Sequence, residues 1–315
     1  MSTVQAQIAS PAMSLKSWAM LVLLGIIWGG SFFFARIAVS ELQPLTLVLF
    51  RVAIAALALQ IYLAATGVSF RAALPYAPGL VLLAVFNNVI PFSLIFAGQT
   101  QLGAGLASVL NATTPFWTVL LASQLTTDEK LSWNKVLGIL LGIAGTAVMI
   151  GPGLFSGLGA PTWAKLALIG ASVSYAFALM VAKRLRGIPP AVVATAQLTA
   201  STIVMLPIVL ILNGSDGLFA FSAPVWAAVV SLALLSTAFA YLLYFRLVAE
   251  AGATNASLVT LIVPASAVLL GVLFLGERLE PIEMLGMLVI ALGLVTIDGR
   301  LLDSATRAIG PKRSP

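Results

Sequence analysis

The sequence predicts an all-α integral membrane protein, a ten-transmembrane-helix bundle made of two inverted five-helix repeats. Three observations lead to this prediction: the composition, an internal repeat and the placement of the basic residues. Of the 315 residues, 61% are hydrophobic and only 8% are charged, whereas a soluble domain carries about 25% charged residues. Long apolar runs without alternation favour helices over a barrel, because a backbone in lipid must satisfy its own hydrogen bonds.

The apolar segments are long enough to cross a bilayer and are separated by Pro- and Gly-rich breaks. We expect spans at residues 18–38, 44–65, 76–97, 103–124, 133–151, 163–184, 190–212, 224–245, 254–275 and 281–298. We expect residues 1–17 to be a cytoplasmic disordered N-terminus, 18–151 the first repeat, 163–298 the second, and 299–315 a cytoplasmic basic tail. The first apolar run is too long for a signal peptide and is expected to be an uncleaved span.

The internal repeat relates residues 103–148 to residues 252–296. The offset is 149 positions and becomes 148 after a one-residue gap, so that Gly103 matches Gly252, Pro115 matches Pro264 and Gly138 matches Gly286. Each copy holds an odd number of predicted spans, so the second copy must run through the membrane in the opposite sense. Inverted repeats of this kind are the architecture of many secondary transporters.

The basic residues indicate the orientation. With a cytoplasmic N-terminus, the outer side receives only Arg36, Lys165 and Arg278, Arg51 falls within a span, and all other Lys and Arg of the 16 face inward. By the positive-inside rule, both termini are therefore cytoplasmic. The same rule explains the net charge of +6, so we expect a lipid bilayer and a small-molecule solute as partners and no nucleic acid. The sequence leaves monomer and homodimer open.

Several motifs carry a family resemblance. They are WGGSFFFARIAV from Trp28, the pair Phe50-Arg51, and PASAVLLGVLFLGERL from Pro264 followed by Gly286 and Gly293. The chain resembles the EamA domain of the drug/metabolite transporter (DMT) superfamily over about residues 18–298. The first copy departs from the pattern, with Thr-Thr-Asp-Glu at 126–129 where the family usually has Leu-Gly-Glu. The resemblance implies a secondary transporter of small organic solutes, closest to amino-acid and metabolite exporters of bacterial inner membranes.

Arg51 and Gln197 are candidates for the solute pathway. Arg51 lies about two helical turns inside its span, roughly 10 Å from the outer end at 1.5 Å per residue, and polar groups at such positions are costly. It either meets an anionic solute group or gates the outer mouth, or its side chain reaches the interface. Gln197 occupies the matching position in the second copy and keeps the length without the charge.

Asn87 and Asn88 lie near the middle of the third span, four and three residues before Pro91. A proline inside a helix removes one backbone hydrogen bond, and we expect it to free a carbonyl at about residue 87. The two amides either line the solute pathway or join neighbouring helices as structural hydrogen bonds.

The fourth and ninth spans repeat one pattern, in which a polar pair precedes a proline. Both prolines are expected to kink their helices near the membrane centre, beside polar groups that point to a solute site. The residues are Ser108, Asn111 and Pro115 in the first copy, and Ser257, Thr260 and Pro264 in the second.

Aromatic residues fall into two groups. Trp28, Trp117, Tyr175, Tyr241 and Tyr244 either line a pocket for an amphipathic solute or pack within the bundle. The Trp residues at span ends form an interfacial belt. Glycine pairs such as Gly138 and Gly142 indicate close helix packing, with a dimer face as the alternative.

The residue types that the chain lacks limit its chemistry. It has no cysteine and no histidine, and we expect no metal site, no cofactor and no enzyme activity, because a catalytic constellation is absent. All ten acidic residues are expected in loops or at span ends, so we predict uniport, exchange, or coupling that uses no mid-membrane acid. There is no Walker-type phosphate loop. A non-transporting scaffold or sensor and a solute channel are the alternatives to a carrier.

Overall fold

A computed structural model describes residues 13–125, 132–155, 161–185, 187–214 and 219–298. Within these ranges every regular element is helical, with no strand. Eight helical segments are long and apolar enough to cross a membrane, and Val259–Leu275 and Pro281–Ile297 are shorter apolar helices. The chain is therefore a multi-pass helical membrane protein. We call the end of the bundle that holds residues 38–44 the outer end, following the predicted topology.

The first half of the bundle begins with two uninterrupted long helices. These are α1 (Leu15–Ala38) and α2 (Pro44–Thr66). The third segment is composite and consists of η1 (Phe70–Tyr76), α3 (Ala77–Ala84), η2 (Val85–Val89) and α4 (Ile90–Gln99). The fourth is divided into α5 (Ala104–Asn111) and α6 (Thr114–Leu125), and α7 (Trp133–Phe155) follows.

The second half has a similar order of elements, without a counterpart of η1. It begins with α8 (Thr162–Ala182) and α9 (Pro190–Asn213). The next segment consists of α10 (Ala223–Val230), η3 (Ser231–Phe239) and α11 (Ala240–Ala251). Then come α12 (Ala253–Ala256), α13 (Val259–Leu275) and α14 (Pro281–Asp298).

Proline and glycine set the helix boundaries. Pro44 and Pro190 stand in the first turn of α2 and α9, where the missing N–H costs no helical hydrogen bond. Gly67 and Gly276 follow α2 and α13 in the left-handed conformation, which glycine adopts without steric cost. These local rules explain why helix ends follow the sequence breaks.

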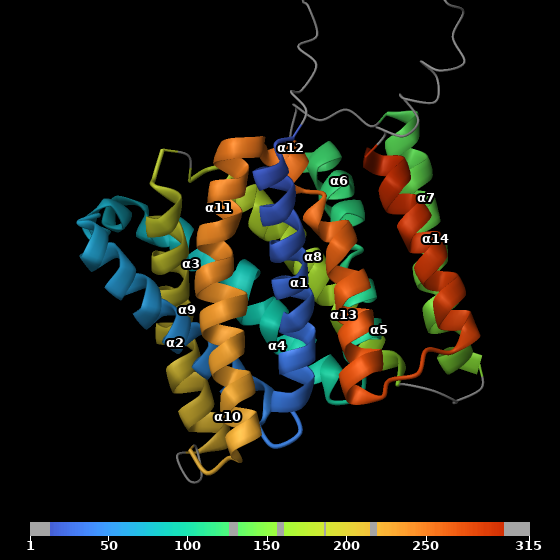
Figure 1. Cartoon of the computed structure of the whole chain (residues 1–315), viewed down its shortest axis with the longest axis horizontal. Coiled ribbons are helices and arrows are strands. Elements are labelled where there is room, and N and C mark those ends of the chain that lie inside the picture. Colours follow the sequence, from blue (N-terminus) through green and yellow to red (C-terminus); the bar gives the residue numbers. More distant parts are fainter. Residues whose placement is uncertain (1–12, 126–131, 156–160, 186, 215–218, 299–315) are drawn as a thin grey trace, which may run out of the picture.

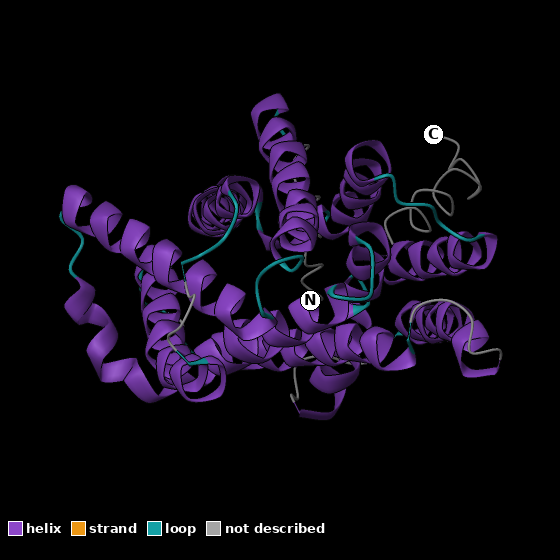
Figure 2. Ribbon diagram, turned by 90° about the horizontal axis from the view of Figure 1, so that it is seen from below, coloured by secondary structure: helices purple, strands orange, loops and turns teal. Residues whose placement is uncertain are grey.

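The helices pack in pairs that join the two halves (Figure 1). α7 and α14 lie side by side at one end of the elongated bundle, α1 packs against α13, α8 packs against α4 and α6, and α2 packs against α9. Figure 2 shows the same bundle from below, with helices only among its described elements. The main core lies between these pairs and includes the fully buried Phe96, Leu47 and Leu232.

Glycines allow the closest of these contacts. A Cβ on Gly138 would meet the Gly293 carbonyl oxygen at 2.8 Å, and a Cβ on Gly145 would meet the Gly286 carbonyl oxygen at the same distance. The two backbones of α7 and α14 therefore touch, as is common where van der Waals packing joins helices in lipid. The close packing predicted for glycines such as Gly138 is found here between two helices of the same chain.

Candidate functional site

The centre of the bundle contains two π-helical segments, η2 and η3, which sit in the third and eighth predicted spans. The Ile90 N–H bonds the Val85 carbonyl, and the Ala240 N–H bonds the Leu235 carbonyl, both five residues back. Single π-helical turns inside α-helices occur frequently at functional sites. Such segments were not predicted from the sequence.

Pro91 explains where η2 leaves a free backbone group. In a five-residue hydrogen-bond pattern the carbonyl of Phe86 would need the N–H of residue 91, which proline lacks. The Ser174 hydroxyl of α8 donates to that Phe86 carbonyl over 2.7 Å instead. The freed carbonyl is thus that of Phe86 and not that of residue 87, because the helix is wider here than the predicted α-helix.

Arg51 lies at the centre of a buried polar cluster. Its side chain is 7% exposed, so it does not reach the interface. Its Nε donates to the Thr237 hydroxyl of η3 over 2.9 Å, and its guanidinium carbon stands 3.8 Å from the centre of the Phe92 ring. Tyr175 and Tyr241 lie near the guanidinium. Among the described residues no carboxylate pairs with this cation.

Asn87 and Gln197 continue the cluster on its other side. The Asn87 amide nitrogen donates to Gln197 Oε1 over 2.9 Å and lies 3.1 Å from the Tyr241 hydroxyl. Asn88 is buried and donates to the Ser201 hydroxyl over 3.0 Å, while its own Oδ1 has no partner. The structure thus brings together Arg51, Asn87, Gln197 and Tyr241, and places Tyr175 nearby.

Asn111, Pro115 and Trp117 lie at the interruption between α5 and α6. Pro115 cannot bond the Asn111 carbonyl, which accepts hydrogen bonds from Ser172 and from Thr114 instead. The buried Asn111 Oδ1 and Trp117 Nε1 have no partner. Trp117 lines an apolar pocket of about 280 Å³ between α6, α7 and α8. These residues form a second region, separate from the hydrogen bonds around Arg51.

Four predicted residues do not join either region. Ser108 is buried and bonds the Gly105 carbonyl of its own helix. Ser257 is exposed, and Thr260 bonds the Ser257 carbonyl, so the two polar pairs have different surroundings. Trp28 packs against Tyr244, with ring centres 5.5 Å apart.

Pro264 and Lys165 complete the predicted residues of this region. α13 continues through Pro264, whereas in the first copy α6 begins at Thr114, one residue before Pro115. Lys165, expected on the outer side, is 3% exposed and donates to the Met149 carbonyl of α7 over 2.7 Å. A lysine within an apolar run was the available signal for this contact.

The cluster around Arg51 can bind an anionic or hydrogen-bonding group. Its members offer guanidinium and amide donors together with hydroxyl groups, and the aromatic rings add apolar contact area. Within the described ranges no group of three His, Cys, Asp or Glu side chains could hold a metal ion. The described acidic residues lie in loops or at helix ends, for example Glu41, Glu250 and Glu277.

Comparisons with known proteins identify the family. The sequence model of the EamA-like transporter family matches residues 15–151 and again residues 162–297. The chain belongs to the EamA-like transporter family. An Escherichia coli K12 protein named as the uncharacterized inner membrane transporter YedA is 32% identical over 298 residues, which cover 92% of this chain and 94% of that protein.

Two further similarities extend over nearly the whole chain. A probable terminal-alkyne amino-acid exporter of Streptantibioticus cattleyicolor is 28% identical over 94% of this chain and 97% of its own length. A solved crystal structure with 20% identity matches 95% of this chain and all of its own with a TM-score of 0.65, which supports the fold alone. The chain is therefore a multi-pass membrane transporter, and its family points to transport without enzymatic chemistry.

Proposed function

We propose that this transporter is a secondary carrier that moves a small organic solute by alternating access and holds an anionic group of that solute, such as a carboxylate, at Arg51. The observation that carries the proposal is a buried guanidinium that has no carboxylate partner among the described residues and a single hydrogen bond, from Nε. A buried charge is costly unless it is paired. An anionic solute group would supply the missing partner.

The matched glycine contacts support two inverted repeats. With the offset of 148, Gly138 corresponds to Gly286 and Gly145 to Gly293. The contact of Gly138 with Gly293 therefore corresponds to the contact of Gly286 with Gly145, and both occur. A twofold axis between the two halves would relate these two contacts to each other. This supports repeats at residues 18–151 and 163–298.

The polar contacts near the centre follow the same rule. Arg51 of α2 reaches Thr237 in η3, and its counterpart Gln197 of α9 reaches Asn87 in η2. Likewise, Ser174 of α8 bonds a carbonyl of η2, and Ser236 of η3 bonds the Ile27 carbonyl of α1. Each half thus contributes to a shared site near the membrane centre, where such carriers bind their solutes.

For the biological setting we propose export of amino acids or related metabolites and drugs across a bacterial inner membrane, with both termini in the cytoplasm. The names of two relatives, an inner membrane transporter and a probable amino-acid exporter, support this choice. In the described spans no carboxylate is placed for a proton relay, so we propose uniport, exchange, or coupling that uses no mid-membrane acid.

Counterflow in proteoliposomes tests the proposal. Purified protein is screened against labelled amino acids, nucleobases and cationic drugs, and we expect saturable counterflow of a solute with a carboxylate. Arg51→Gln should strongly reduce this flux at low solute concentration, whereas Arg71→Gln, a change at an exposed position, should leave it unchanged. Flux that never saturates would indicate a channel, and no flux for any solute would indicate a scaffold or sensor.

A further inference from the structure

A carboxylate from the second half caps the N-terminus of a helix of the first half at the outer end of the bundle. Glu277, in the turn between α13 and α14, accepts hydrogen bonds from the Ala104 N–H over 2.6 Å and from the Gly105 N–H over 3.1 Å. Both donors belong to the first turn of α5, whose N–H groups have no partner within the helix. A carboxylate at this position also complements the helix dipole.

Three glycines make room for this carboxylate. A Cβ on Gly103 would stand 2.6 Å from the Glu277 carboxyl carbon, and a Cβ on Gly271 would overlap its Oε2. A Cβ on Gly105 would lie 3.6 Å from the same oxygen. Glycines of both α5 and α13, with Gly103 just before α5, thus leave the space that the Glu277 carboxylate occupies.

A second pair of contacts crosses the bundle beside the first. Arg36 of α1 donates from Nη1 to the Gln99 carbonyl over 2.6 Å and to the Thr100 carbonyl over 3.3 Å. Gln99, at the end of α4, is buried and donates to the Phe32 carbonyl of α1 over 2.8 Å. Arg36, Gln99 and Glu277 with their partners are called the outer contacts below.

The outer contacts join two groups of helices, which also touch each other where α5 packs against α13. In the first group, α1 and α13 approach through Gly25 and Gly29, and the Ser266 hydroxyl bonds the Gly25 carbonyl over 2.9 Å. In the second group, α8 packs on α4 at Gly98 and bonds the Leu110 carbonyl of α5 through Ser172. Every outer contact runs from one group to the other.

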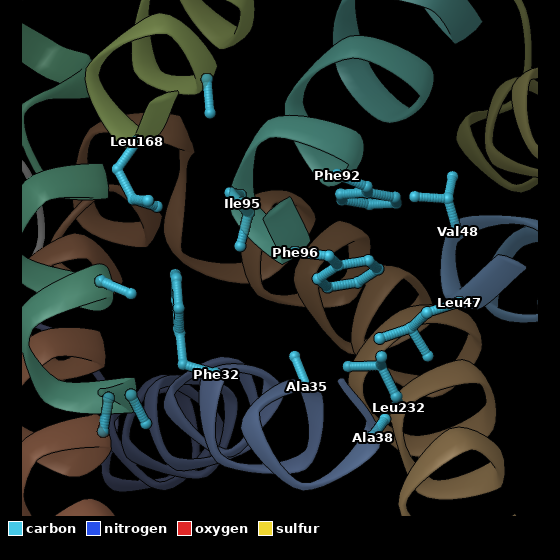
Figure 3. Close-up of a cluster of buried hydrophobic side chains, with 14 of the residues drawn as sticks. Phe32, Ala35, Ala38, Leu47, Val48, Phe92, Ile95, Phe96, Leu168 and Leu232 are labelled. Carbon is cyan, nitrogen blue, oxygen red and sulfur yellow. The ribbon is translucent and has the colours of Figure 1, made fainter. Parts of the chain in front are cut away.

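An apolar layer lies directly inside the outer contacts. Phe32 and Ala35 of the first group and Ile95 and Phe96 of the second group belong to one buried cluster (Figure 3). Phe96 is fully buried and lies near the Arg51 guanidinium, at 5.7 Å from its ring centre to the guanidinium carbon. Phe32 and Ile95 stand one helical turn before Arg36 and Gln99 of the outer contacts.

We propose that the outer contacts and this apolar layer form the outer gate of the carrier, closed in this structure, and that Glu277 releases α5 in each transport cycle. The inference rests on the proposed function, because a carrier must expose its central site to the outer face. Arg36, Thr100, Gly103 and Glu277 line a cavity of about 770 Å³ at the outer end. Water there can replace the broken hydrogen bonds, which lowers the cost of opening.

A disulfide across the gate tests the proposal. The chain has no native cysteine, so the pair Gly103→Cys and Glu277→Cys can be introduced cleanly. Gly103 has φ of −67°, a backbone conformation that any residue adopts. Oxidation should reduce solute flux to that of empty vesicles, and reduction should restore it. Undiminished flux through the oxidised protein would overturn the proposal.

The matched control links α1 to α11, away from the outer contacts. The side-chain tips of Lys16 in α1 and Glu250 in α11 form an ion pair of 2.8 Å, and α1 packs against α11. A bifunctional thiol reagent that spans the length of these two side chains should bridge Lys16→Cys and Glu250→Cys without loss of flux.

A labelling experiment remains decisive if the cross-linked variant does not fold. Ala35→Cys serves as a reporter, because Ala35 is buried in the apolar layer. A membrane-impermeant maleimide added from outside should react faster when Glu277→Gln is added, since the neutral amide binds α5 more weakly. An equal or slower reaction would contradict the gate. If the wild-type chain carried no solute at all, the proposed function would fail, while labelling would still decide whether these contacts open.

Discussion

At the residue scale, Arg51 is a buried cation that donates a hydrogen bond to Thr237 and lies against the Phe92 ring. Removing one partner of a buried ion pair leaves an uncompensated charge, but no such partner is present among the described residues. We therefore predict that Arg51→Gln folds with little loss of stability and loses affinity for the solute. A hydrogen bond to a charged group contributes about 1.5–3 kcal/mol, which corresponds to roughly a 10- to 100-fold weaker apparent affinity.

Thermal unfolding in detergent and counterflow at several solute concentrations measure the two effects separately. A large drop in the unfolding temperature without a change in affinity would show that Arg51 is structural. Arg51→Lys should restore only part of the affinity, because an ammonium group cannot bind a carboxylate through two parallel hydrogen bonds.

Glu41 gives a pH dependence at the outer surface. The Ser222 hydroxyl and N–H donate to its carboxylate over 2.6 and 2.8 Å, and these hydrogen bonds lower the pKa of Glu41 from its ordinary value of 4.5. The folded-state pKa is depressed, so the stabilisation is present above pH 4.5 and is lost as the pH falls through the folded-state pKa.

The unfolding temperature of Glu41→Gln should accordingly lie below that of the wild type near neutral pH and approach it in acid. The control is Glu280→Gln, since the described structure gives the Glu280 side chain no hydrogen bond. A constant difference between wild type and Glu41→Gln across this pH range would show that the tie to Ser222 is not electrostatic.

At the element scale, the contact of α7 with α14 depends on glycine. A side chain at position 145 would meet the Gly286 carbonyl oxygen and the Ile290 side chain at 2.8 Å, and overpacking of this kind costs about 1–3 kcal/mol. We predict that Gly145→Leu lowers the unfolding temperature. Ala144→Leu, at an exposed position of the same helix, should not, and equal effects of the two changes would contradict this account.

The π-helical segment η2 allows a rescue experiment. Ser174→Ala leaves the Phe86 carbonyl without its donor, and an unsatisfied buried polar group costs about 1–3 kcal/mol. Pro91→Ala restores an N–H that can bond this carbonyl. We predict that the double variant recovers stability relative to Ser174→Ala alone. If the stability losses of Ser174→Ala and Pro91→Ala simply add in the double variant, Pro91 does not determine which group bonds the Phe86 carbonyl.

The positions of the helices could be predicted from the sequence, but their irregularities could not. The predicted spans at 190–212 and 281–298 correspond to Pro190–Asn213 and Pro281–Asp298, because local Pro and Gly signals end helices. The π-helical segments and the interruption before Pro115 depend on hydrogen bonds to other helices, which no local pattern contains. Glu277 lies within the motif that begins at Pro264, yet its contact with α5 joins residues 173 positions apart.

At the scale of the whole molecule, membership of the family says which kind of protein this is, and the pairing of helices across the two halves suggests how it operates. The same pairs that hold the bundle together, such as α1 with α13 and α8 with α4, define the groups that move relative to each other in the proposed gating mechanism. In that proposal, stability and transport depend on the same contacts between halves. This view requires that the two halves cross the membrane in opposite senses.

Repeat-related positions on opposite faces test that requirement. Ser132 before α7 corresponds to Glu280 before α14 with the offset of 148, and both are exposed. In an inverted arrangement with cytoplasmic termini, Glu280→Cys should react with an impermeant maleimide on intact cells, whereas Ser132→Cys should react only after permeabilisation. Reaction of both from the same side would exclude inverted halves, because two matched positions of an inverted repeat cannot share a face. If Ser132→Cys reacted on intact cells and Glu280→Cys only after permeabilisation, the halves would still be inverted. The termini would then lie outside, against the distribution of Lys and Arg.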